Sequence, residues 1–564
     1  MTASSTHPSH PSGIALRGVP VVPGVAYAPV IRPGRLPSLD DGGDVAEPDR
    51  SAEAERFKAA ASAVATRLRD RAAHASGAAS EVLAATATLA QDRAWLSAAE
   101  KRITAGAPAV GAVIGAVEQF AEMFTKLGGL MAERVTDLRD IRDRVIAELM
   151  GLPEPGVPTP SVPSILCAED LAPADTAGLD PALVVALATT LGGPTSHTAI
   201  IARQLGIPCV VAVEGLDDVD AGTMVLVDGT AGTVLVTPDA AAAGEAVEAA
   251  RRDAERAAGW SGPGATADGH AIAVLANVQD GAAARAARET AAEGIGLFRT
   301  ELCFLNRETE PTVDEQADIY AEVLDAFAGH KVVIRTLDAG SDKPLKFADH
   351  PDEANPALGV RGIRVAGGNP GLLDRQLEAI AAAGKRTGNP PWVMAPMIAT
   401  AQEAEHFAAQ VRSHGLTPGV MIEVPSAALL AGRILEHVDF LSIGTNDLAQ
   451  YTMAADRMSA ELAALTDPWQ PAVLTLVAMA ARAGASAGKP VGVCGEAAAD
   501  PLLACVLAGL GVTSLSSAAA AVQGVGAKLA RVTLQQCRDA AEAVLAASSA
   551  ADARAAALGV LDPE

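Results

Sequence analysis

Charged and polar residues end several short apolar runs in the C-terminal half of the chain. "GLFRTE" carries Arg299, "VVIRTLD" carries Arg335 and "VMIEVP" carries Glu423, while "SIGTND" carries Asn446 and Asp447. Arginine binds phosphate and carboxylate groups through paired hydrogen bonds. If these ends converge, the arginines predict a ligand with several negative oxygens.

The two acidic residues, Glu423 and Asp447, add a second requirement. Their carboxylates would repel such a ligand unless a cation lay between them. Magnesium commonly binds one or two carboxylates together with substrate oxygens. Arginines with magnesium also clamp a phosphoryl group during its transfer. The pattern therefore predicts a Mg²⁺-dependent phosphoryl-transfer site.

Three further residues fit this site. Arg361 lies in "NPALGVRGIR" and Arg457 lies in "YTMAADR", shortly after "GTND". Cys494 ends the apolar run of "PVGVCGE". A cysteine in that context is either a small buried hydrophobic residue or a proton donor that faces the ligand.

A separate candidate lies in "GGPTSHTAIIARQLG". Two glycines permit tight backbone turns, Thr195 and Ser196 are good N-cap residues, and a helical pattern follows. His197 is thus expected in the first turn of a helix, where the dipole and free N–H groups favour an anion and make the imidazole less basic. A neutral imidazole is a nucleophile, although an ordinary surface histidine is the alternative.

Alternating strand-like and helical segments surround the strand-end residues. Seven apolar runs, separated by helical patterns, follow one another over about 300 residues. Such alternation predicts a (β/α)8 (TIM) barrel, here over residues 263–564, and catalytic groups of such barrels gather at the C-terminal strand ends. The fold class predicted for the whole chain is a multidomain α/β protein.

The N-terminal half divides into further parts. Residues 1–15 are polar and predicted to be disordered. Residues 16–40 and 153–238 predict one α/β domain, with a helical block at 41–152 inserted into it. An alanine-rich segment at 239–262 predicts a linker helix.

Composition limits the functional classes. A net charge of -25 over 564 residues argues against a nucleic-acid surface. The six cysteines form no CxxC pair, and no signal peptide or membrane-spanning run is present. We therefore expect a reduced, cytoplasmic protein with no membrane insertion.

The motifs together resemble a known family. "GGPTSHTAIIARQLGIPCVV" resembles the phosphohistidine signature of the PEP-utilising enzymes, in which PEP is phosphoenolpyruvate. "GIGLFRTE", "RTLDAGSDK", "NPALGVRGIR", "MIEVPSAA", "SIGTNDLAQYTMAADR" and "VGVCGE" resemble their PEP-binding barrel. The order and spacing, from about Gly18 to about Ala530, are similar to enzyme I of the PEP:sugar phosphotransferase system.

This resemblance implies roles for the substrate-site residues. Arg299, Arg335 and Arg457 would hold PEP with help from Asn446. The resemblance also implies that Lys343 and Arg361 lie near the phosphate, and that Asp447 lies in the substrate site as well as the metal site.

The resemblance implies a chemistry and partners as well. His197 would be phosphorylated and Thr176 would orient it, Cys494 would protonate the enolate, and Glu423 with Asp447 would hold Mg²⁺. The phosphoryl group would pass to the histidine of the carrier protein HPr, docked on the helical block. The resemblance further implies a homodimer formed through the barrel, and a swivel of the α/β domain about the linker would connect the two transfers.

Two other functions compete with this one. PEP synthases and pyruvate phosphate dikinases share the phosphohistidine and PEP-binding domains but add an ATP-grasp domain, for which the N-terminal 150 residues are too few and too helical. A non-catalytic PEP-binding regulator should lack one of the catalytic groups, and all of them are filled with competent residues here.

Overall fold

The computed structural model describes residues 13–562 apart from short gaps and forms two compact units, residues 1–251 and 252–564. The gaps are 35–44, 75–77, 128–133, 153–154, 159, 172–178, 194–195, 305–306, 341–344, 349–352, 354, 370, 458, 460–461 and 463. The predicted tail at 1–15 falls largely outside the described residues.

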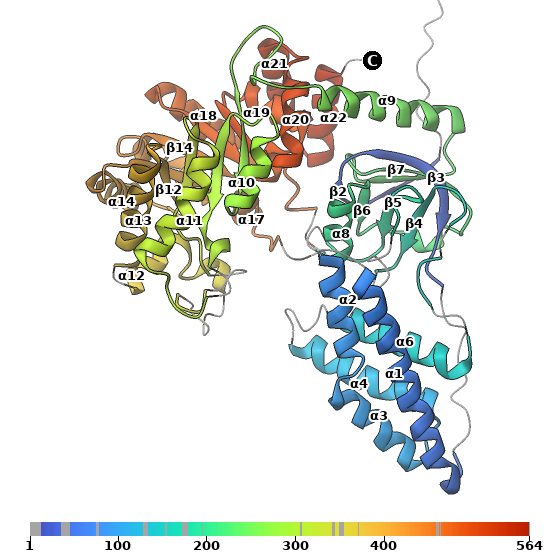
Figure 1. Cartoon of the computed structure of the whole chain (residues 1–564). Coiled ribbons are helices and arrows are strands. Elements are labelled where there is room, and N and C mark those ends of the chain that lie inside the picture. The colour runs from blue at the N-terminus through green and yellow to red at the C-terminus, as the bar shows by residue number, and fades with distance from the viewer. Residues whose placement is uncertain are drawn as a thin grey trace, which may run out of the picture. The chain divides into compact units, whose positions relative to one another are not determined.

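The first unit contains a mixed sheet of eight strands in the order β1-β8-β7-β3-β4-β5-β6-β2 (Figure 1). Strands β3 to β6 run parallel, and the other neighbours are antiparallel. The central strand β4 is buried at every position, as expected for a parallel strand covered on both faces. The strands are β1 (Ile14–Arg17), β2 (Val19–Val22), β3 (Val25–Ile31), β4 (Ser164–Ala168), β5 (Val184–Thr189), β6 (Cys209–Val211), β7 (Met224–Asp228) and β8 (Thr233–Val236).

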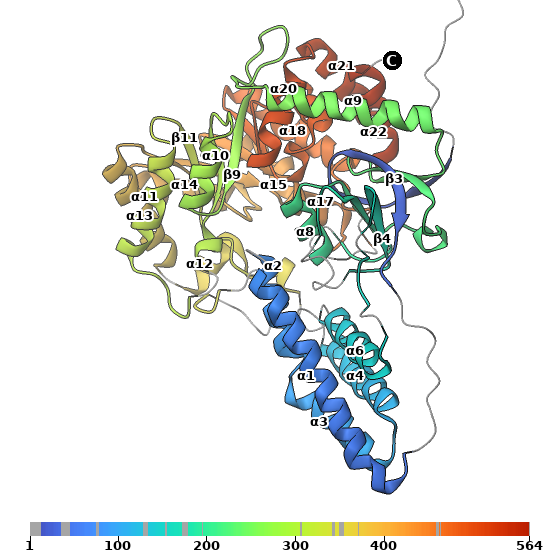
Figure 2. The same cartoon turned by 45° about the vertical axis from the view of Figure 1, so that its right-hand side comes forward.

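A helical bundle is inserted between β3 and β4. Its core is formed largely by small aliphatic residues around Phe57 and Trp95, whose rings meet edge to face with centroids 5.9 Å apart. The long helices run side by side in both views (Figures 1 and 2). They are α1 (Arg50–His74), α2 (Ala78–Leu89), α3 (Arg93–Ala105), α4 (Ala109–Leu127) and α6 (Val135–Met150).

One helix contains the division between the two units. Helix α9 (Ala240–Ala258) runs through Arg251 and Arg252 and ends just before "GWSGPG". It occupies most of the segment predicted to be a linker helix. Its alanine-rich sequence explains why it forms, since alanine has the highest helix propensity.

The second unit is a closed barrel of eight parallel strands. Neighbours pair in chain order, and the last strand closes the barrel on the first. The strands are β9 (Ala273–Val278), β10 (Gly294–Arg299), β11 (Lys331–Arg335), β12 (Trp392–Ala395), β13 (Thr417–Ile422), β14 (Phe440–Gly444), β15 (Val491–Cys494) and β16 (Ser514–Ala518).

Helices surround the barrel, and side chains fill its interior. The interior cluster contains Leu297, Met394, Met421 and Cys494, so the barrel is a packed core rather than a pore. The surrounding helices are α10 (Gly281–Arg288), α11 (Val313–Ala326), α12 (Val365–Gly368), α13 (Leu372–Thr387), α14 (Ala401–Ser413), α15 (Pro425–Leu429), α16 (Ala431–Ile434), α17 (Thr445–Met453), α18 (Pro471–Ala487), α19 (Pro501–Gly509), α20 (Ala519–Leu529), α21 (Leu534–Leu545) and α22 (Ala550–Leu561).

The predicted fold class is confirmed, with an α/β sheet domain, an inserted helical bundle and a (β/α)8 barrel. The seven apolar runs predicted as barrel strands correspond to β9 to β15. The eighth strand, β16, was not among them, because its sequence "SLSSA" is too polar and small to stand out as a strand. All six cysteines carry free thiols. Among the described residues, no helix has the length and apolar character needed to cross a membrane.

Candidate active site

The predicted barrel residues lie at or just beyond the C-terminal ends of the strands. Parallel pairing explains this convergence, since Arg299 at the end of β10 is in register with Arg335 at the end of β11. Gly444 on β14 is in register with Cys494 on β15. The remaining members follow their strands, with Glu423 after β13 and Asn446 and Asp447 in the first turn of α17, after β14.

Arg335 is the centre of a buried ion-pair cluster. Its Nη2 donates to Glu301 Oε1 at 2.7 Å, and its Nη1 lies 2.9 Å from Asp338 Oδ2. Burial alone would lower the pKa of this guanidinium, but the carboxylates of Asp338 and Glu301 outweigh it and keep the pKa above its usual value. Arg335 therefore stays charged although it is buried.

Arg361 connects two of the acidic residues. Its Nη2 donates to both oxygens of Asp338 at 3.1–3.2 Å, and its Nη1 donates to Asp447 Oδ1 and to the Tyr451 hydroxyl, each at 3.2 Å. Three polar atoms in this cluster, Arg335 Nε, Arg361 Nε and Glu301 Oε2, are buried and have no hydrogen-bond partner among the described residues. Buried polar atoms are normally satisfied, so unpaired ones at a site indicate an absent ligand or water.

The cluster carries more negative than positive charge. Four buried carboxylates, on Glu301, Asp338, Glu423 and Asp447, surround the buried guanidiniums of Arg335 and Arg361. Burial and the nearby carboxylates of Asp338 and Asp447 raise the pKa of Glu423 to about 8. A cation would relieve this imbalance.

The surroundings of Glu423 leave one oxygen accessible to such a cation. Its Oε1 accepts a hydrogen bond from the Met397 backbone N–H at 2.6 Å. A Cβ on Gly444 would come within 3.2 Å of its Oε2, so the glycine keeps space open beside that oxygen. Within the described residues, no group of three His, Cys, Asp or Glu side chains is arranged to hold a metal alone. Glu423 and Asp447 together with substrate oxygens suit Mg²⁺, which keeps few protein ligands.

Arg299 differs from the two buried arginines. It is half-buried, and its guanidinium makes no hydrogen bond or ion pair with the described residues. Its guanidinium is therefore available to an anionic ligand beside the Arg335 cluster.

The segment after β14 supplies the other predicted residues. Asn446 Oδ1 accepts from the Glu496 N–H at 3.1 Å, which ties α17 to the segment after β15. The N–H of Arg457 donates to Gln450 Oε1 at 3.0 Å, which holds the backbone of Arg457 next to α17.

Cys494 lies in the barrel interior below these charges and is 2% exposed. Burial raises the pKa of its thiol above the usual value, and the hydrogen bond from Ser442 Oγ at 3.4 Å offsets this in part. The thiol lies 3.5 Å from the Ile443 carbonyl, to which it donates. It thus remains protonated at neutral pH, as a proton donor must.

His197 is the first residue of α8 (His197–Leu205), as predicted. Ser196 caps this helix, and its hydroxyl accepts from the Ala199 N–H at 3.3 Å. The next side chain, Thr198, is buried, and its Oγ1 has no hydrogen-bond partner in the described structure. The backbone arrangement therefore suits an anion at this helix end. Thr176 and Lys343 lie outside the described residues.

Two site residues, Glu301 and Asp338, were not predicted from the sequence. Both follow a site arginine by two or three positions, in "FRTE" and "RTLD", and this placement was the available signal. Tyr451, whose hydroxyl donates to the Ala357 carbonyl, gave no signal beyond its position one turn after Asp447.

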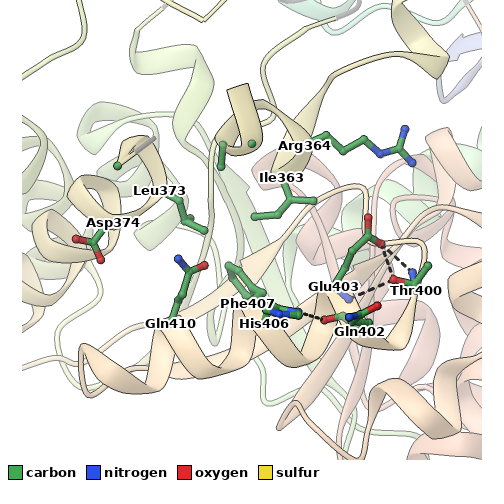
Figure 3. Close-up of a pocket in the computed structure, with 13 residues that line it drawn as sticks. Ile363, Arg364, Leu373, Asp374, Thr400, Gln402, Glu403, His406, Phe407 and Gln410 are labelled. Atoms are coloured by element: carbon green, nitrogen blue, oxygen red, sulfur yellow. Dashed lines mark hydrogen bonds between the residues drawn. The ribbon is translucent and has the colours of Figure 1, made fainter. Parts of the chain in front are cut away.

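A cavity of about 450 Å³ lies away from these residues (Figure 3). One face of α14, with Gln402, His406, Phe407 and Gln410, lines it opposite Ile363. None of the predicted site residues lines it, so its size gives no reason to move the candidate site.

Comparison with known proteins agrees with the geometry. The chain matches three models of the PEP-utilising enzymes: the N-terminal domain over residues 17–134, the mobile domain over 160–232 and the PEP-binding domain over 254–534. It is 50% identical over 555 residues to the phosphoenolpyruvate-protein phosphotransferase of Streptomyces coelicolor, covering 97% of this chain and 99% of that protein.

A more distant relative carries the same name. The phosphoenolpyruvate-protein phosphotransferase of Haloferax volcanii is 42% identical over 470 residues, which are 80% of this chain and 81% of that one. The solution structure of an Enzyme I protein is 30% identical and covers 43% of this chain and 98% of that chain, with a TM-score of 0.35. This chain therefore belongs to the PEP-utilising enzymes, and within them to the family of phosphoenolpyruvate-protein phosphotransferases.

Proposed function

We propose that this protein takes the phosphoryl group of PEP onto His197 and passes it to the histidine of an HPr-type carrier protein, releasing pyruvate. In the first step the bond between phosphorus and the enol oxygen breaks, and a bond from phosphorus to the His197 imidazole forms. The remaining enolate takes a proton at its terminal carbon. The observation that carries this proposal is the cluster of buried arginines and carboxylates with unpaired polar atoms at the barrel's strand ends.

Four residues of the barrel bind PEP in this proposal. Arg299, Arg335 and Arg457 bind its phosphate and carboxylate oxygens, and Asn446 assists. The absence of other described partners for Arg299 supports its assignment, since a guanidinium without a carboxylate is available to the substrate. Lys343 and Arg361 lie near the phosphate in this proposal.

Glu423 and Asp447 hold a divalent cation, which we propose is Mg²⁺. The excess of buried carboxylates and the open space beside Glu423 Oε2 support this assignment. When bound, the cation neutralises charge on the phosphoryl oxygens. Glu423→Gln should abolish any rise in melting temperature that Mg²⁺ causes in the presence of PEP, whereas Glu496→Gln should leave it unchanged.

Cys494 supplies the proton to the enolate. The position of its thiol in the barrel interior and its raised pKa support this role. At the other centre, the start of α8 stabilises the phosphate on His197, and Thr176 orients the imidazole.

The inserted bundle is the proposed docking surface for the carrier. It interrupts the same domain that contains His197, and this proximity in the chain supports docking of the carrier on the unit proposed to be phosphorylated. A hydrogen bond from Thr136 Oγ1 to Asp170 Oδ2 at 3.1 Å joins α6 to the segment after β4. A protein that accepts the phosphoryl group distinguishes this proposal from a nucleotide-dependent synthase or dikinase.

Homodimerisation through the barrel is also proposed. Several large apolar side chains of the barrel unit are exposed, among them Leu358 at 67% and Leu429 at 61%. Covering such residues favours self-association. Light scattering across a dilution series would show a dimer mass that falls toward that of a monomer.

A cytoplasmic location remains a prediction.

Labelled PEP tests the function directly. Purified protein and His197→Ala are incubated with radiolabelled PEP and Mg²⁺, each with and without HPr. We expect acid-labile label on the wild type alone and its transfer to HPr. Label on both proteins would place the nucleophile elsewhere.

The remaining outcomes separate the competing functions. PEP binding without label on either protein would favour a non-catalytic regulator. Label that AMP removes and HPr does not would favour a synthase or dikinase.

A further inference from the structure

A buried hydrogen-bond network lies behind the arginine-bearing strand ends. At its centre is Gln376 on α13, which is 1% exposed. Its Nε2 donates to Thr300 Oγ1 at 3.1 Å and to the Tyr320 hydroxyl at 3.2 Å. Its Oε1 accepts from the Leu337 backbone N–H at 3.0 Å. One side-chain amide thus makes three hydrogen bonds where water is excluded.

Two of these bonds join the segments that carry Arg299 and Arg335. Thr300 directly follows Arg299, and its Oγ1 donates to the Arg335 carbonyl at 2.9 Å. Leu337 follows Arg335 by two positions. The ladder between β10 and β11 ends at the Arg299 and Arg335 pair, so side chains must satisfy the backbone beyond it. Gln376 satisfies the buried Leu337 N–H and holds the two segments together.

The same segments supply the carboxylates that orient Arg335. Glu301 follows Thr300, and Asp338 follows Leu337. A shift of either segment would therefore move Arg299, Glu301 or Asp338 relative to the Arg335 guanidinium. Paired recognition of phosphate or carboxylate is sensitive to displacements of about 0.5–1 Å. The amide thus sets the spacing between the two arginines.

The far side of the network offers a matched control. The Tyr320 hydroxyl donates to Gln316 Oε1 at 3.0 Å, and Gln316 Nε2 donates to the Pro311 carbonyl at 3.0 Å. Gln316 is 2% exposed, nearly as buried as Gln376. Its two bonds stabilise α11 and its N-terminal segment but reach neither arginine-bearing segment.

We propose that Gln376 is a positioning residue that fixes the spacing of Arg299 and Arg335 for PEP binding. The inference rests on the proposed function only in taking PEP as the ligand of these arginines. It adds a residue of the outer helical layer that never touches the substrate.

The experiment compares Gln376→Met with Gln316→Met in the full-length protein. Each variant is titrated with PEP and Mg²⁺ in a calorimeter, and its melting temperature is recorded. Both lose buried hydrogen bonds, so both should melt earlier, and Gln376→Met should lose more because Gln376 makes three such bonds and Gln316 makes two. Gln376→Met should weaken PEP binding about tenfold or more, whereas Gln316→Met should stay within about threefold of the wild type. Equal PEP affinities for the two variants would overturn the proposal.

Gln376→Glu provides a second readout that a purely structural role would not change. An ionised carboxylate cannot donate to Thr300 or Tyr320, whereas the protonated acid can donate one hydrogen bond. The PEP affinity of this variant relative to the wild type should therefore recover as pH falls from 8 to 6. A ratio that stays flat with pH would contradict the inference.

The two proposals fail in distinguishable ways. A wild type that binds PEP but takes no label overturns the phosphotransfer function, and the variant affinities still decide the role of Gln376. A wild type that binds no PEP overturns both.

Discussion

At the scale of single residues, Cys494 is the proposed proton donor with the most direct test. Cys494→Ala removes a buried thiol, which the burial keeps protonated by raising its pKa. A positioned general acid contributes about 10²–10⁴-fold to a rate. We expect pyruvate release in the presence of PEP and HPr to slow by a factor in this range, measured with a coupled lactate dehydrogenase assay.

Ser442→Ala is the matched control for this prediction. It removes the hydrogen bond that favours the thiolate, so the pKa of Cys494 rises further and the thiol stays protonated. Pyruvate release should stay within a few-fold of the wild type. A Cys494→Ala rate equal to that of Ser442→Ala would remove the proton-donor role.

A second residue, Lys331, is a half-buried cation at the start of β11. Its Nζ lies 3.8 Å from the centroid of the Trp392 ring and 5.6 Å from that of Phe440. Burial lowers its pKa to about 8. At neutral pH this shift corresponds to a desolvation cost of about 3 kcal/mol for the charged ammonium. The cation–π contacts offset about 0.5–2 kcal/mol of that cost.

Lys331→Met should therefore raise the free energy of unfolding of the barrel by about 1–3 kcal/mol at pH 7. Between pH 8 and the unfolded-state value near 10.5, the unfolded chain binds more protons, so wild-type stability rises with pH and the advantage of the variant fades. Urea unfolding from pH 7 to 10 would show this convergence. The exposed Lys385→Met is the control and should not raise the free energy of unfolding at pH 7. A Lys331→Met variant less stable than the wild type at pH 7 would refute the prediction.

Arg299, Arg335 and Glu423 could be predicted because each stands at the end of an apolar run. Glu301 and Asp338 could not, since an acid shortly after a strand also fits an ordinary loop. Their role depends on the pairing of β10 with β11, which brings Glu301 to Arg335. Gln376 is a polar residue on the buried face of α13 and has no local signal, because its partners come from three other segments of the chain.

At the scale of elements, α22 secures the start of α18 through Arg554. Its Nη2 lies 3.1 Å from Asp500 Oδ2, and its guanidinium lies 5.2 Å from the centroid of the Trp469 ring. Trp469 Nε1 donates to the same Asp500 oxygen at 3.0 Å, and Asp500 also caps α19. The Asp500 side chain thus joins α22, α19 and the residue that precedes α18 by two positions. Helix α22 lies beyond the region matched by the PEP-binding model.

Arg554→Met should lower the free energy of unfolding of the barrel by about 1–2 kcal/mol, because it removes both the charged hydrogen bond and the ring contact. Arg554→Lys should restore less than half, since lysine lacks the planar group. Urea unfolding measures both. The exposed Arg538→Met serves as control. An equal loss in free energy of unfolding there would show that the contacts of Arg554 contribute no more than those of any other arginine on these helices.

The elements could be predicted where their own sequences carried a clear signal. Seven barrel strands stood out as apolar runs, and α8 and α9 followed from capping residues and alanine content. The strand β16 did not, because serine and alanine have weak strand preference. Its place is set by neighbours on both sides, β15 and β9, which leave one gap in the barrel for it to close.

At the scale of the whole molecule, the histidine proposed to be phosphorylated and the proposed PEP site belong to different compact units. His197 lies within residues 1–251, and Arg299 and Arg335 lie within residues 252–564. In-line transfer requires reacting atoms about 3–3.5 Å apart, which one arrangement can hardly satisfy for both PEP and HPr. We predict a swivel of the α/β domain about residues 239–262.

Small-angle scattering with and without PEP and Mg²⁺ tests this swivel. The radius of gyration should change when both ligands are added. His197→Ala should bind PEP without accepting phosphate, so it would separate the effect of binding from that of phosphorylation. An unchanged scattering curve for the wild type would rule out a large motion.

The insertion of the bundle between β3 and β4 also bears on how the chain folds. Val30 on β3 pairs with Ile165 on β4, so this contact spans the entire insertion and carries a high loop-closure entropy. The first and last helices of the bundle meet, with Arg67 Nη1 2.9 Å from Glu148 Oε2. A bundle that folds first would shorten the effective loop and so lower the entropy cost of closing the contact between β3 and β4. We therefore expect substitutions in the bundle core to slow formation of the sheet, although they lie outside it.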